Sequence, residues 1–366
     1  MIITVTAKAI AHDGKTVCFN IENEKQVLFV PGLVPGEQAK IEQDTLEIIE
    51  ITKTSPDRTS PPCPYFSNCG GCDFQFMNIK AERKHKLDLI KHTLKNYFHL
   101  DFQRYIDCSQ DLPEYNYRNR VNFQRQNKKI GFFSKRSNSL VEIDSCMLAK
   151  PEINEELSKQ DYFQDLPEEI TQVIIESRRG KIHTAQKKIK GKLKSQDSHP
   201  TGSFSQVNNA GNKKLIEILL QQKWGKQLTE FYAGSGNFTF QLKKQVRSIV
   251  AVESDSRLVK LAKHRVFSNK IHQLKFIKST TEKYIKTADI HGSVLLDPPR
   301  SGAKELAAKL TPKKNPLVVY VSCNPSTLGR DLQILEKKGY QMEELYFIDM
   351  FSRTRHVECL AVLTAS

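Results

Sequence analysis

Short runs of alternating apolar and polar residues fill the first sixty positions. They read IITVTAKAIA, TVCFNI, QVLFV, EQAKIEQ and LEIIEITKT. Such alternation predicts half-buried strands, and Asp13-Gly14 and Pro35-Gly36 are turn signals between them. Five short strands within about 60 residues are typical of a small β-barrel of the OB type. The run TSPDRTSPPCP, rich in Pro, Ser and Thr, then predicts a linker.

A helical period and two basic segments follow. Apolar residues from Ile79 to Leu94 recur near a period of 3.6 and predict a helix over about 78–98. Aromatic residues then alternate with arginines, as in YNYRNRVNFQR (115–125). This interleaving suits stacked bases and contacted phosphates, and equally an ordinary amphipathic sheet. Residues 178–194 hold eight Lys/Arg and no acid, which predicts a basic hairpin or arm before the linker SQDSHPTGS.

From about residue 204 the pattern changes to alternating helix and strand. The buried-strand candidates are QLTEFYA, SIVAVES, LKFIKS, SVLLD, LVVYVS and ECLAVLT. Helical segments such as 212–222 and 255–267 lie between them. Strands that alternate with helices over about 160 residues predict a doubly wound, Rossmann-like α/β sheet that is mostly parallel.

The charge of the chain narrows the classes of partner. Its 56 Lys+Arg and 41 Asp+Glu give a formal net charge of +15, although residues 1–61 are net acidic. A surplus of this size favours a polyanionic partner, with RNA or DNA first. No apolar run approaches the roughly 18 residues of a membrane helix, and no secretory signal is visible. We therefore expect a cytoplasmic monomer with no membrane partner.

A glycine-rich turn predicts a nucleoside cofactor. In FYAGSGNF, a strand runs into Gly234-x-Gly236, where the backbone can approach a ligand closely. Glu253 stands at the end of the next strand, where a carboxylate can accept both ribose hydroxyls. The glycine-rich turn together with Glu253 is stronger evidence for a nucleoside cofactor than the turn alone.

Three further residues stand where ligands bind in such a sheet. Asp297 in LLDPPR and Cys323 in VSCNP each follow a buried strand, and Glu358 in RTRHVE opens the last one. Glu358 and Cys323 are expected to face the same crevice at the carboxyl edge of the sheet. The alternative for Glu358 is an ion pair with Arg353 or Arg355 in a surface loop.

Cysteines crowd together in CPYFSNCGGC, with Cys63, Cys69 and Cys72 in a C-x5-C-x2-C spacing. In a reducing compartment this spacing indicates a metal or an iron–sulfur cluster rather than disulfides. A fourth ligand is required, and Cys146, Cys108 and, less well placed, Cys18 are the candidates. Zinc usually takes paired C-x2-4-C spacings, so a cluster with one distant ligand fits better.

Together these segments resemble the RNA uracil-C5 methyltransferase family over essentially the whole chain. DGKTVCF and FVPGLVPGEQAKI resemble its TRAM domain, and YNYRNRVNF resembles its RNA-facing strand. FSQVN, FYAGSGNFTF, LDPPRSG, VSCNPSTLGRDL and RTRHVE match the motifs of its catalytic domain in order. The cysteine segment, together with IDSCMLA, resembles the family's [4Fe-4S] site and singles out Cys146 as the fourth ligand.

The resemblance implies three domains. They are a TRAM-like OB β-barrel (1–57), a central α+β domain with the iron–sulfur site and an RNA-binding surface (58–197), and a class I methyltransferase domain (198–366). The cofactors are S-adenosylmethionine and a [4Fe-4S] cluster.

The resemblance also assigns roles. Cys323 is the nucleophile that adds to C6 of uracil, and Glu358 is the base that removes the C5 proton. The cofactor-binding positions are Gln206, Tyr232, Gly234, Gly236, Glu253 and Asp297, and the metal ligands are Cys63, Cys69, Cys72 and Cys146. We expect 23S rRNA rather than the tRNA T-loop as substrate, because bacterial tRNA enzymes typically lack TRAM.

Two other classes compete with this interpretation. RNA cytosine-C5 methyltransferases carry a second cysteine in the motif that reads DPPR here, and its absence argues against them. A non-catalytic RNA-binding protein with TRAM and a cluster is the other class. The presence of both Cys323 and Glu358 argues against it.

Overall fold

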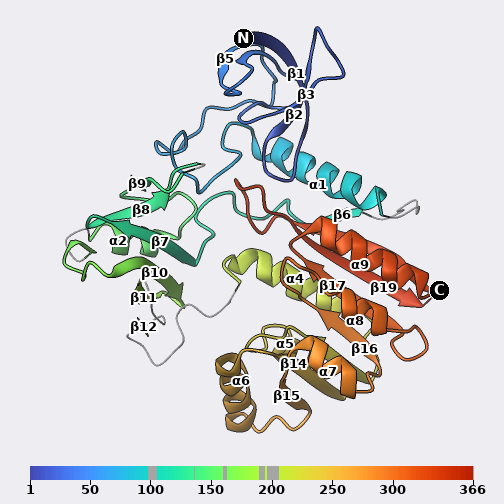
Figure 1. The fold of residues 1–366 in the computed structure, drawn as a ribbon. Coiled ribbons are helices and arrows are strands. Elements are labelled where there is room, and N and C mark those ends of the chain that lie inside the picture. The colour runs from blue at the N-terminus through green and yellow to red at the C-terminus, as the bar shows by residue number, and fades with distance from the viewer. Residues whose placement is uncertain (98–104, 136, 160–162, 189–193, 196–205, 366) are drawn as a thin grey trace. The chain divides into compact units, whose positions relative to one another are not determined.

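The computed structural model describes residues 1–97, 105–135, 137–159, 163–188, 194–195 and 206–365 (Figure 1). The chain forms two compact units. The first unit comprises Met1–Leu89, Pro113–Gly202 and Phe351–His356, and the second comprises Ile90–Leu112, Ser203–Met350 and Val357–Ser366. Helix α1 (Ile79–Lys95) confirms the helix predicted over about 78–98. The division between the two units falls within this helix, after Leu89.

The first sheet of the first unit contains the five strands predicted from the alternating pattern. They are β1 (Ile2–Ile10), β2 (Thr16–Asn20), β3 (Val27–Val30), β4 (Gln38–Glu42) and β5 (Ile48–Lys53), in the order β3-β2-β1-β4-β5. All neighbours in this sheet are antiparallel. Alternate residues such as Val5, Cys18 and Ile41 form its core. The period of two therefore sets both the strands and the buried face.

The predicted linker after β5 is anchored to this sheet. The buried carboxylate of Glu37 accepts hydrogen bonds from Arg58 Nε at 2.5 Å and Nη2 at 2.6 Å. It also accepts the backbone N–H groups of Val34 and Ser55. Arg58 donates a further hydrogen bond to Gly32 O. This buried, bidentate pair ties the start of the linker to the turn before β4.

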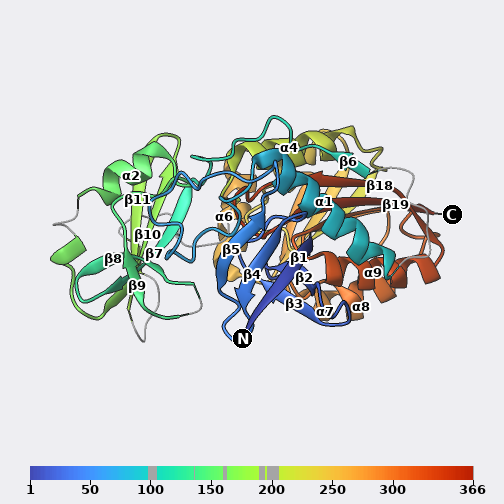
Figure 2. The same cartoon turned by 90° about the horizontal axis from the view of Figure 1, so that it is seen from above.

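The second sheet of the first unit has six strands in the order β12-β11-β10-β7-β8-β9. They are β7 (Arg120–Gln126), β8 (Lys129–Phe133), β9 (Leu140–Glu142), β10 (Ile170–Arg178), β11 (Lys181–Lys188) and β12 (Lys194–Ser195). Helix α2 (Pro151–Leu157) packs on β10 and β11 (Figure 2). Phe123, Phe163 and Val173 lie in the shared core.

One arginine of the predicted RNA-facing strand has a structural role. Arg125 on β7 is buried, and its guanidinium donates five hydrogen bonds to backbone carbonyls. The acceptors are the carbonyl oxygens of Phe163, Gln164, Leu166, Pro167 and Ile170. For Arg125, the structure therefore favours the amphipathic-sheet interpretation over a phosphate contact.

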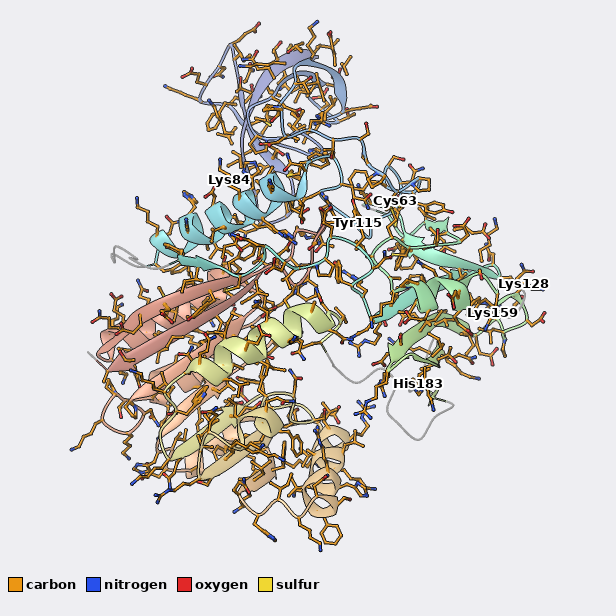
Figure 3. All side chains as sticks on the ribbon, turned by 180° about the vertical axis from the view of Figure 1, so that it is seen from behind. Cys63, Lys84, Tyr115, Lys128, Lys159 and His183 are labelled. Atoms are coloured by element: carbon orange, nitrogen blue, oxygen red, sulfur yellow. The ribbon has the colours of Figure 1, made fainter. Side chains whose placement is uncertain are left out.

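The basic segment forms a hairpin, as predicted. Strands β10 and β11 pair antiparallel, and the turn at Arg179 and Gly180 has positive φ at both residues. Side chains such as His183 on β11, together with Lys128 and Lys159, project from this part of the unit (Figure 3). The predicted linker SQDSHPTGS lies almost wholly outside the described residues.

The second unit is built on an eight-stranded sheet in the order β15-β14-β13-β16-β17-β19-β18-β6. The strands are β6 (Tyr105–Asp107), β13 (Gln227–Phe231), β14 (Ser248–Glu253), β15 (Leu274–Lys278), β16 (Ser293–Leu296), β17 (Leu317–Ser322), β18 (Tyr340–Ile348) and β19 (Glu358–Ala365). The first five in this order are parallel, and β19 is antiparallel to both neighbours. This confirms the predicted mostly parallel α/β sheet.

Helices cover both faces of this sheet. They are α4 (Asn209–Gln221), α5 (Thr239–Leu242), α6 (Ser256–Ser268), α7 (Thr281–Thr287), α8 (Lys304–Lys309) and α9 (Pro325–Lys337). Helix α4 lies on one face, and α7, α8 and α9 lie on the other (Figure 2). No helix in the described part of the chain has the length and apolar character to cross a membrane.

Candidate active site

The carboxyl ends of four parallel strands share one edge of the eight-stranded sheet. Phe231 at the end of β13 pairs with Val252 of β14 and with Leu296 of β16, and Leu296 pairs with Tyr320 of β17. The loops that leave these strands carry the predicted glycine-rich turn and the predicted side chains. Such an edge is where ligands bind in an open α/β sheet.

The reversed strand β19 brings Glu358 to this edge. Because β19 runs antiparallel to β17, with Cys359 opposite Ser322, the residue before Cys359 is level with the residue after Ser322. Glu358 at the start of β19 therefore faces Cys323 at the end of β17. This is the juxtaposition predicted from the sequence.

The half-buried thiol of Cys323 is surrounded by charge of both signs. Its pKa is raised to about 11, first by burial and then by Glu358 and Asp297, because a thiolate would repel their carboxylates. Arg300 acts in the opposite direction and favours the thiolate. The thiol is protonated in this state and requires added positive charge or a proton acceptor to become a nucleophile.

The two carboxyl groups beside this thiol favour their neutral forms. Burial raises the pKa of Asp297 to about 7 and that of Glu358 well above its usual value, and Asp297 adds to the shift at Glu358. Two neighbouring acids of this kind titrate as a pair. Around neutral pH, Asp297 and Glu358 together retain a proton. The two carboxyl groups can therefore both store a proton and accept one.

Helix α9 fixes the loop that follows Asp297. Asn324, the N-cap of α9, donates from Nδ2 to Arg300 O at 3.0 Å, and Thr327 Oγ1 donates to the same oxygen at 3.1 Å. The buried carboxylate of Asp331 accepts the N–H of Ala303 at 2.6 Å. The loop after Asp297 is therefore tied to the helix that starts directly after Cys323.

The glycine-rich turn requires both of its glycines. Gly234 and Gly236 have φ of +56° and +90°, a region that favours glycine. A Cβ at Gly236 would lie 2.7 Å from the Phe240 ring and 2.8 Å from the Phe276 ring. Glu253 supports the turn, because its carboxylate accepts the N–H of Gly234 at 2.9 Å.

A pocket opens beside this turn. Four of the predicted cofactor residues line it: Gln206, Tyr232, Gly234 and Asp297. The other two, Gly236 and Glu253, shape and support the turn. Sequence reasoning missed several lining residues, among them Glu230, Asn237, Phe238 and Arg265.

Glu230 is the missed residue with the clearest signal in the sequence. It is an acid inside the buried strand QLTEF, and burial raises its pKa to about 8. Thr239 Oγ1 donates a hydrogen bond of 2.5 Å to its carboxylate. A buried acid in an apolar strand points to a functional or tightly bonded position.

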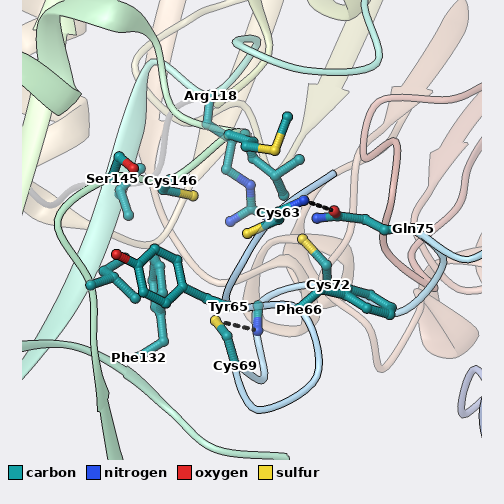
Figure 4. Close-up of a pocket in the computed structure, with 15 residues that line it drawn as sticks. Cys63, Tyr65, Phe66, Cys69, Cys72, Gln75, Arg118, Phe132, Ser145 and Cys146 are labelled. Carbon is teal, nitrogen blue, oxygen red and sulfur yellow. Dashed lines mark hydrogen bonds between the residues drawn. The ribbon is translucent and has the colours of Figure 1, made fainter. Parts of the chain in front are cut away.

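The four predicted metal-binding cysteines line one pocket in the first unit. The side chains of Cys63, Cys69, Cys72 and Cys146 surround it from different sides (Figure 4). Cys146 is fixed by Asn154, which accepts its N–H at 2.9 Å and donates to its carbonyl at 3.1 Å. The other two candidates lie elsewhere, with Cys18 in the core of the first sheet and Cys108 in the second unit.

The cysteine pocket also holds a positive charge. Arg118 lines the pocket, and its buried Nε has no hydrogen-bond partner among the described residues. Burial raises the pKa of Cys72 to about 12 and also raises the pKa of Cys69 and Cys146. Within the described residues, no group of three or more His, Cys, Asp or Glu side chains is placed so that it could hold a metal ion.

The arginines that precede Glu358 pair with other acids. Arg353 forms ion pairs with Glu82 and Glu114, and Arg355 forms one with Asp73. The alternative prediction, in which one of these arginines neutralises Glu358, is therefore wrong.

The fold is an open α/β sheet, and its ligand edge carries the glycine-rich turn and the pocket described above. The sequence model of the tRNA (Uracil-5-)-methyltransferase family matches residues 116–366. The chain belongs to this family.

Curated relatives agree with this assignment, and one solved structure shares the fold. The chain is 29% identical to an uncharacterized RNA methyltransferase of Bdellovibrio bacteriovorus, over 93% of this chain and 90% of the relative. It is 28% identical to the 23S rRNA (uracil(1939)-C(5))-methyltransferase RlmD of Neisseria lactamica, over 92% and 90%. The crystal structure of Pyrococcus abyssi tRNA (uracil-54, C5)-methyltransferase with S-adenosyl-L-homocysteine has the same fold, with a TM-score of 0.75, 20% identity and 99% coverage of both chains.

The charges around Cys323 predict its reactivity. Alkylation by iodoacetamide should accelerate as pH rises towards about 11, because only the thiolate reacts. At pH 8, Asp297→Asn should accelerate alkylation and Arg300→Met should slow it, each severalfold, because they remove opposite charges. Mass spectrometry of the Cys323 peptide measures the rate. Equal rates in the two variants would contradict this picture of the site.

Proposed function

We propose that this protein transfers a methyl group from S-adenosylmethionine to C5 of a specific uridine in 23S rRNA, through a covalent bond between Cys323 and C6. The observation that carries the proposal is the placement of Cys323 level with Glu358 at the edge that also carries Asp297. Full-length similarity to enzymes named for uracil 1939 of 23S rRNA supports the substrate. A tRNA uridine is the alternative, because the family's name and the Pyrococcus enzyme refer to tRNA.

The chemistry explains why a thiol and a carboxyl are both needed. C5 of uracil is a poor nucleophile, and addition of the Cys323 thiolate to C6 converts it into an enolate carbon. The methyl group then moves from the sulfonium to C5, which leaves S-adenosylhomocysteine. Glu358 removes the C5 proton, the C6–sulfur bond breaks, and the thiolate leaves. One proton is released overall, and Asp297 lies beside Glu358 to share it.

The ionisation of the site fits the order of these steps. Both Cys323 and Glu358 must lose their protons to act, although burial favours their neutral forms. A cationic methyl donor at the same edge favours the thiolate and the carboxylate. We propose that Gln206, Tyr232, Gly234, Gly236, Glu253 and Asp297 form its binding site. The target base must be unstacked to reach Cys323, as in other enzymes that modify bases.

We further propose that Cys63, Cys69, Cys72 and Cys146 hold a [4Fe-4S] cluster. A single zinc ion needs its sulfurs at about 2.3 Å from one centre. A cluster binds each thiolate at a different iron, so its ligands stand farther apart around a larger pocket. The cluster with its four thiolates is an anion, and the buried, unpartnered Nε of Arg118 supplies a donor to it.

The remaining parts fit an RNA-binding role. We propose that residues 1–57 form a TRAM-like barrel, 58–197 a central domain, and 198–366 the methyltransferase domain. The β10–β11 hairpin presents basic residues such as Lys181 and Lys187 in the central domain. Such residues contact phosphates without reading sequence.

The choice between the two RNAs has a direct test. In a strain that lacks this protein, one 5-methyluridine of 23S rRNA should disappear while tRNA keeps its T-loop 5-methyluridine. Mass spectrometry of fragments from both RNAs measures this, with the complemented strain as control. Loss of 5-methyluridine from tRNA alone would show that tRNA is the substrate, and the proposed C5 methylation of uridine would still hold.

Glu358→Gln should separate the two halves of the reaction. Addition of Cys323 and methyl transfer need no base at C5, whereas elimination does. The variant should therefore accumulate methylated RNA linked to the protein, visible as a shifted band on a denaturing gel. Cys323→Ala should give no band, alone or combined with Glu358→Gln. Free release of methylated RNA by Glu358→Gln would show that another group takes the proton.

Anaerobically purified protein should be brown and contain about four irons per chain. Cys146→Ala should lower the iron content and the visible absorbance, whereas Cys108→Ala should leave both unchanged. Metal analysis measures the ratio. One zinc per chain without visible absorbance would reject the cluster.

A further inference from the structure

The six residues Phe351–His356 connect β18 to β19 and are called the strap here. They belong to the first unit, although the chain on either side of them belongs to the second. The strap ends two residues before Glu358, the first residue of β19. Its bonding within the first unit is extensive.

A buried ionic cluster holds the strap from one side. The carboxylate of Glu82 on α1 accepts the backbone N–H of Arg353 at 2.7 Å and contacts the Arg353 guanidinium at 3.4 Å. Lys86, one turn further along α1, pairs with Glu82 at 2.7 Å and donates to Phe351 O at 3.1 Å. Glu82, Lys86 and Arg353 are each at most 5% exposed. The cluster therefore bonds both the backbone and a side chain of the strap.

The loop after Cys72 holds the strap from the other side. Asp73 and Phe74 both donate their N–H groups to Arg353 O, at 2.8 and 3.2 Å. The guanidinium of Arg353 donates in return to Met77 O at 2.6 Å and to Phe74 O at 3.3 Å. Tyr117, also buried, donates from its hydroxyl to Ser352 O at 2.9 Å. Three separate segments of the first unit thus fix the strap.

The conformation of Arg353 shows that these contacts determine the backbone. Its φ is +67°, a value that a residue with a Cβ adopts only when its surroundings impose it. Val357 and Glu358 follow after three more residues, so the strap leads directly into the first residue of β19. Burying these charged groups costs desolvation free energy, and apolar side chains would fill the same space without that cost. What the network adds is directed hydrogen bonds, which fix the geometry of the strap.

We propose that Glu82 and Arg353 are positioning residues for Glu358. Their buried ion pair fixes the strap, and the strap fixes the backbone that presents the carboxyl of Glu358 for proton removal. This inference rests on the proposed role of Glu358 as the base. It assigns a contribution to elimination to residues that touch neither RNA nor cofactor.

The consequence is specific to one step. A small displacement of a base slows proton transfer strongly, whereas addition of Cys323 to C6 does not use Glu358. Arg353→Lys keeps the charge but loses the several directed bonds of the guanidinium. In single-turnover reactions this variant should form the covalent RNA adduct at a rate within about twofold of normal. It should release the adduct on the order of tenfold more slowly.

The measurement is the time course of the adduct band on a denaturing gel. Tyr117→Phe removes the bond to Ser352 O and keeps the ion pair of Arg353, so it should slow release in the same direction, by less. This milder variant keeps the test valid if Arg353→Lys folds poorly. Glu37→Gln is the matched control, because Glu37 is as buried as Glu82 and its pair with Arg58 does not contact the strap. It should lower thermal stability and leave the lifetime of the adduct unchanged.

The outcomes separate this inference from the proposed function. Slow release in Arg353→Lys and Tyr117→Phe, but not in Glu37→Gln, supports positioning. A normal adduct lifetime in folded Arg353→Lys and Tyr117→Phe overturns it, as does an equal fall in adduct formation and release. If Glu358→Gln itself accumulates no adduct, the base assignment fails, and that result is read independently of the strap variants.

Discussion

The reversal of a single strand is the constraint on which the active site depends. Parallel strands β14, β13, β16 and β17 deliver their carboxyl ends to one edge of the sheet, and a parallel β19 would deliver its own end there, not its start. Because β19 runs antiparallel to β17, its first residue, Glu358, arrives level with Cys323. The thiol and the carboxyl, which are 35 positions apart in the chain, are brought together by this backbone pairing.

Placing these groups together has an electrostatic consequence. The thiol of Cys323 and the carboxyls of Asp297 and Glu358 each favour the neutral form, because burial and mutual repulsion disfavour three negative charges. The site is thus poorly reactive until positive charge arrives, and a sulfonium cofactor carries that charge. On this account we expect the Cys323 thiol to react faster when the methyl donor is bound, and to react slowly with other electrophiles when it is not.

Much of this could be predicted from the sequence, where local patterns carried the information. Alternation predicted the first five strands, and the glycine-rich turn, Cys323 and Glu358 stand at strand ends that periodicity located. Residues whose roles come from distant partners could not be predicted. Arg125 sits in a motif that suggests RNA contact, yet it binds carbonyls about 40 positions away. Strand β18 was missed because YQMEELYFI mixes acids with apolar residues. The partners of Arg353 lie more than 200 positions earlier.

The central claim is that Cys323 forms a covalent bond with C6 of a uridine and that the C5 proton must leave before the bond breaks. The most direct test is incubation with S-adenosylmethionine and rRNA that contains 5-fluorouridine, followed by digestion and mass spectrometry. Fluorine at C5 cannot leave as a proton, so the account predicts a stable complex that carries the methylated nucleotide on the Cys323 peptide. Methylation without any covalent complex, or a complex at another residue, would contradict the account.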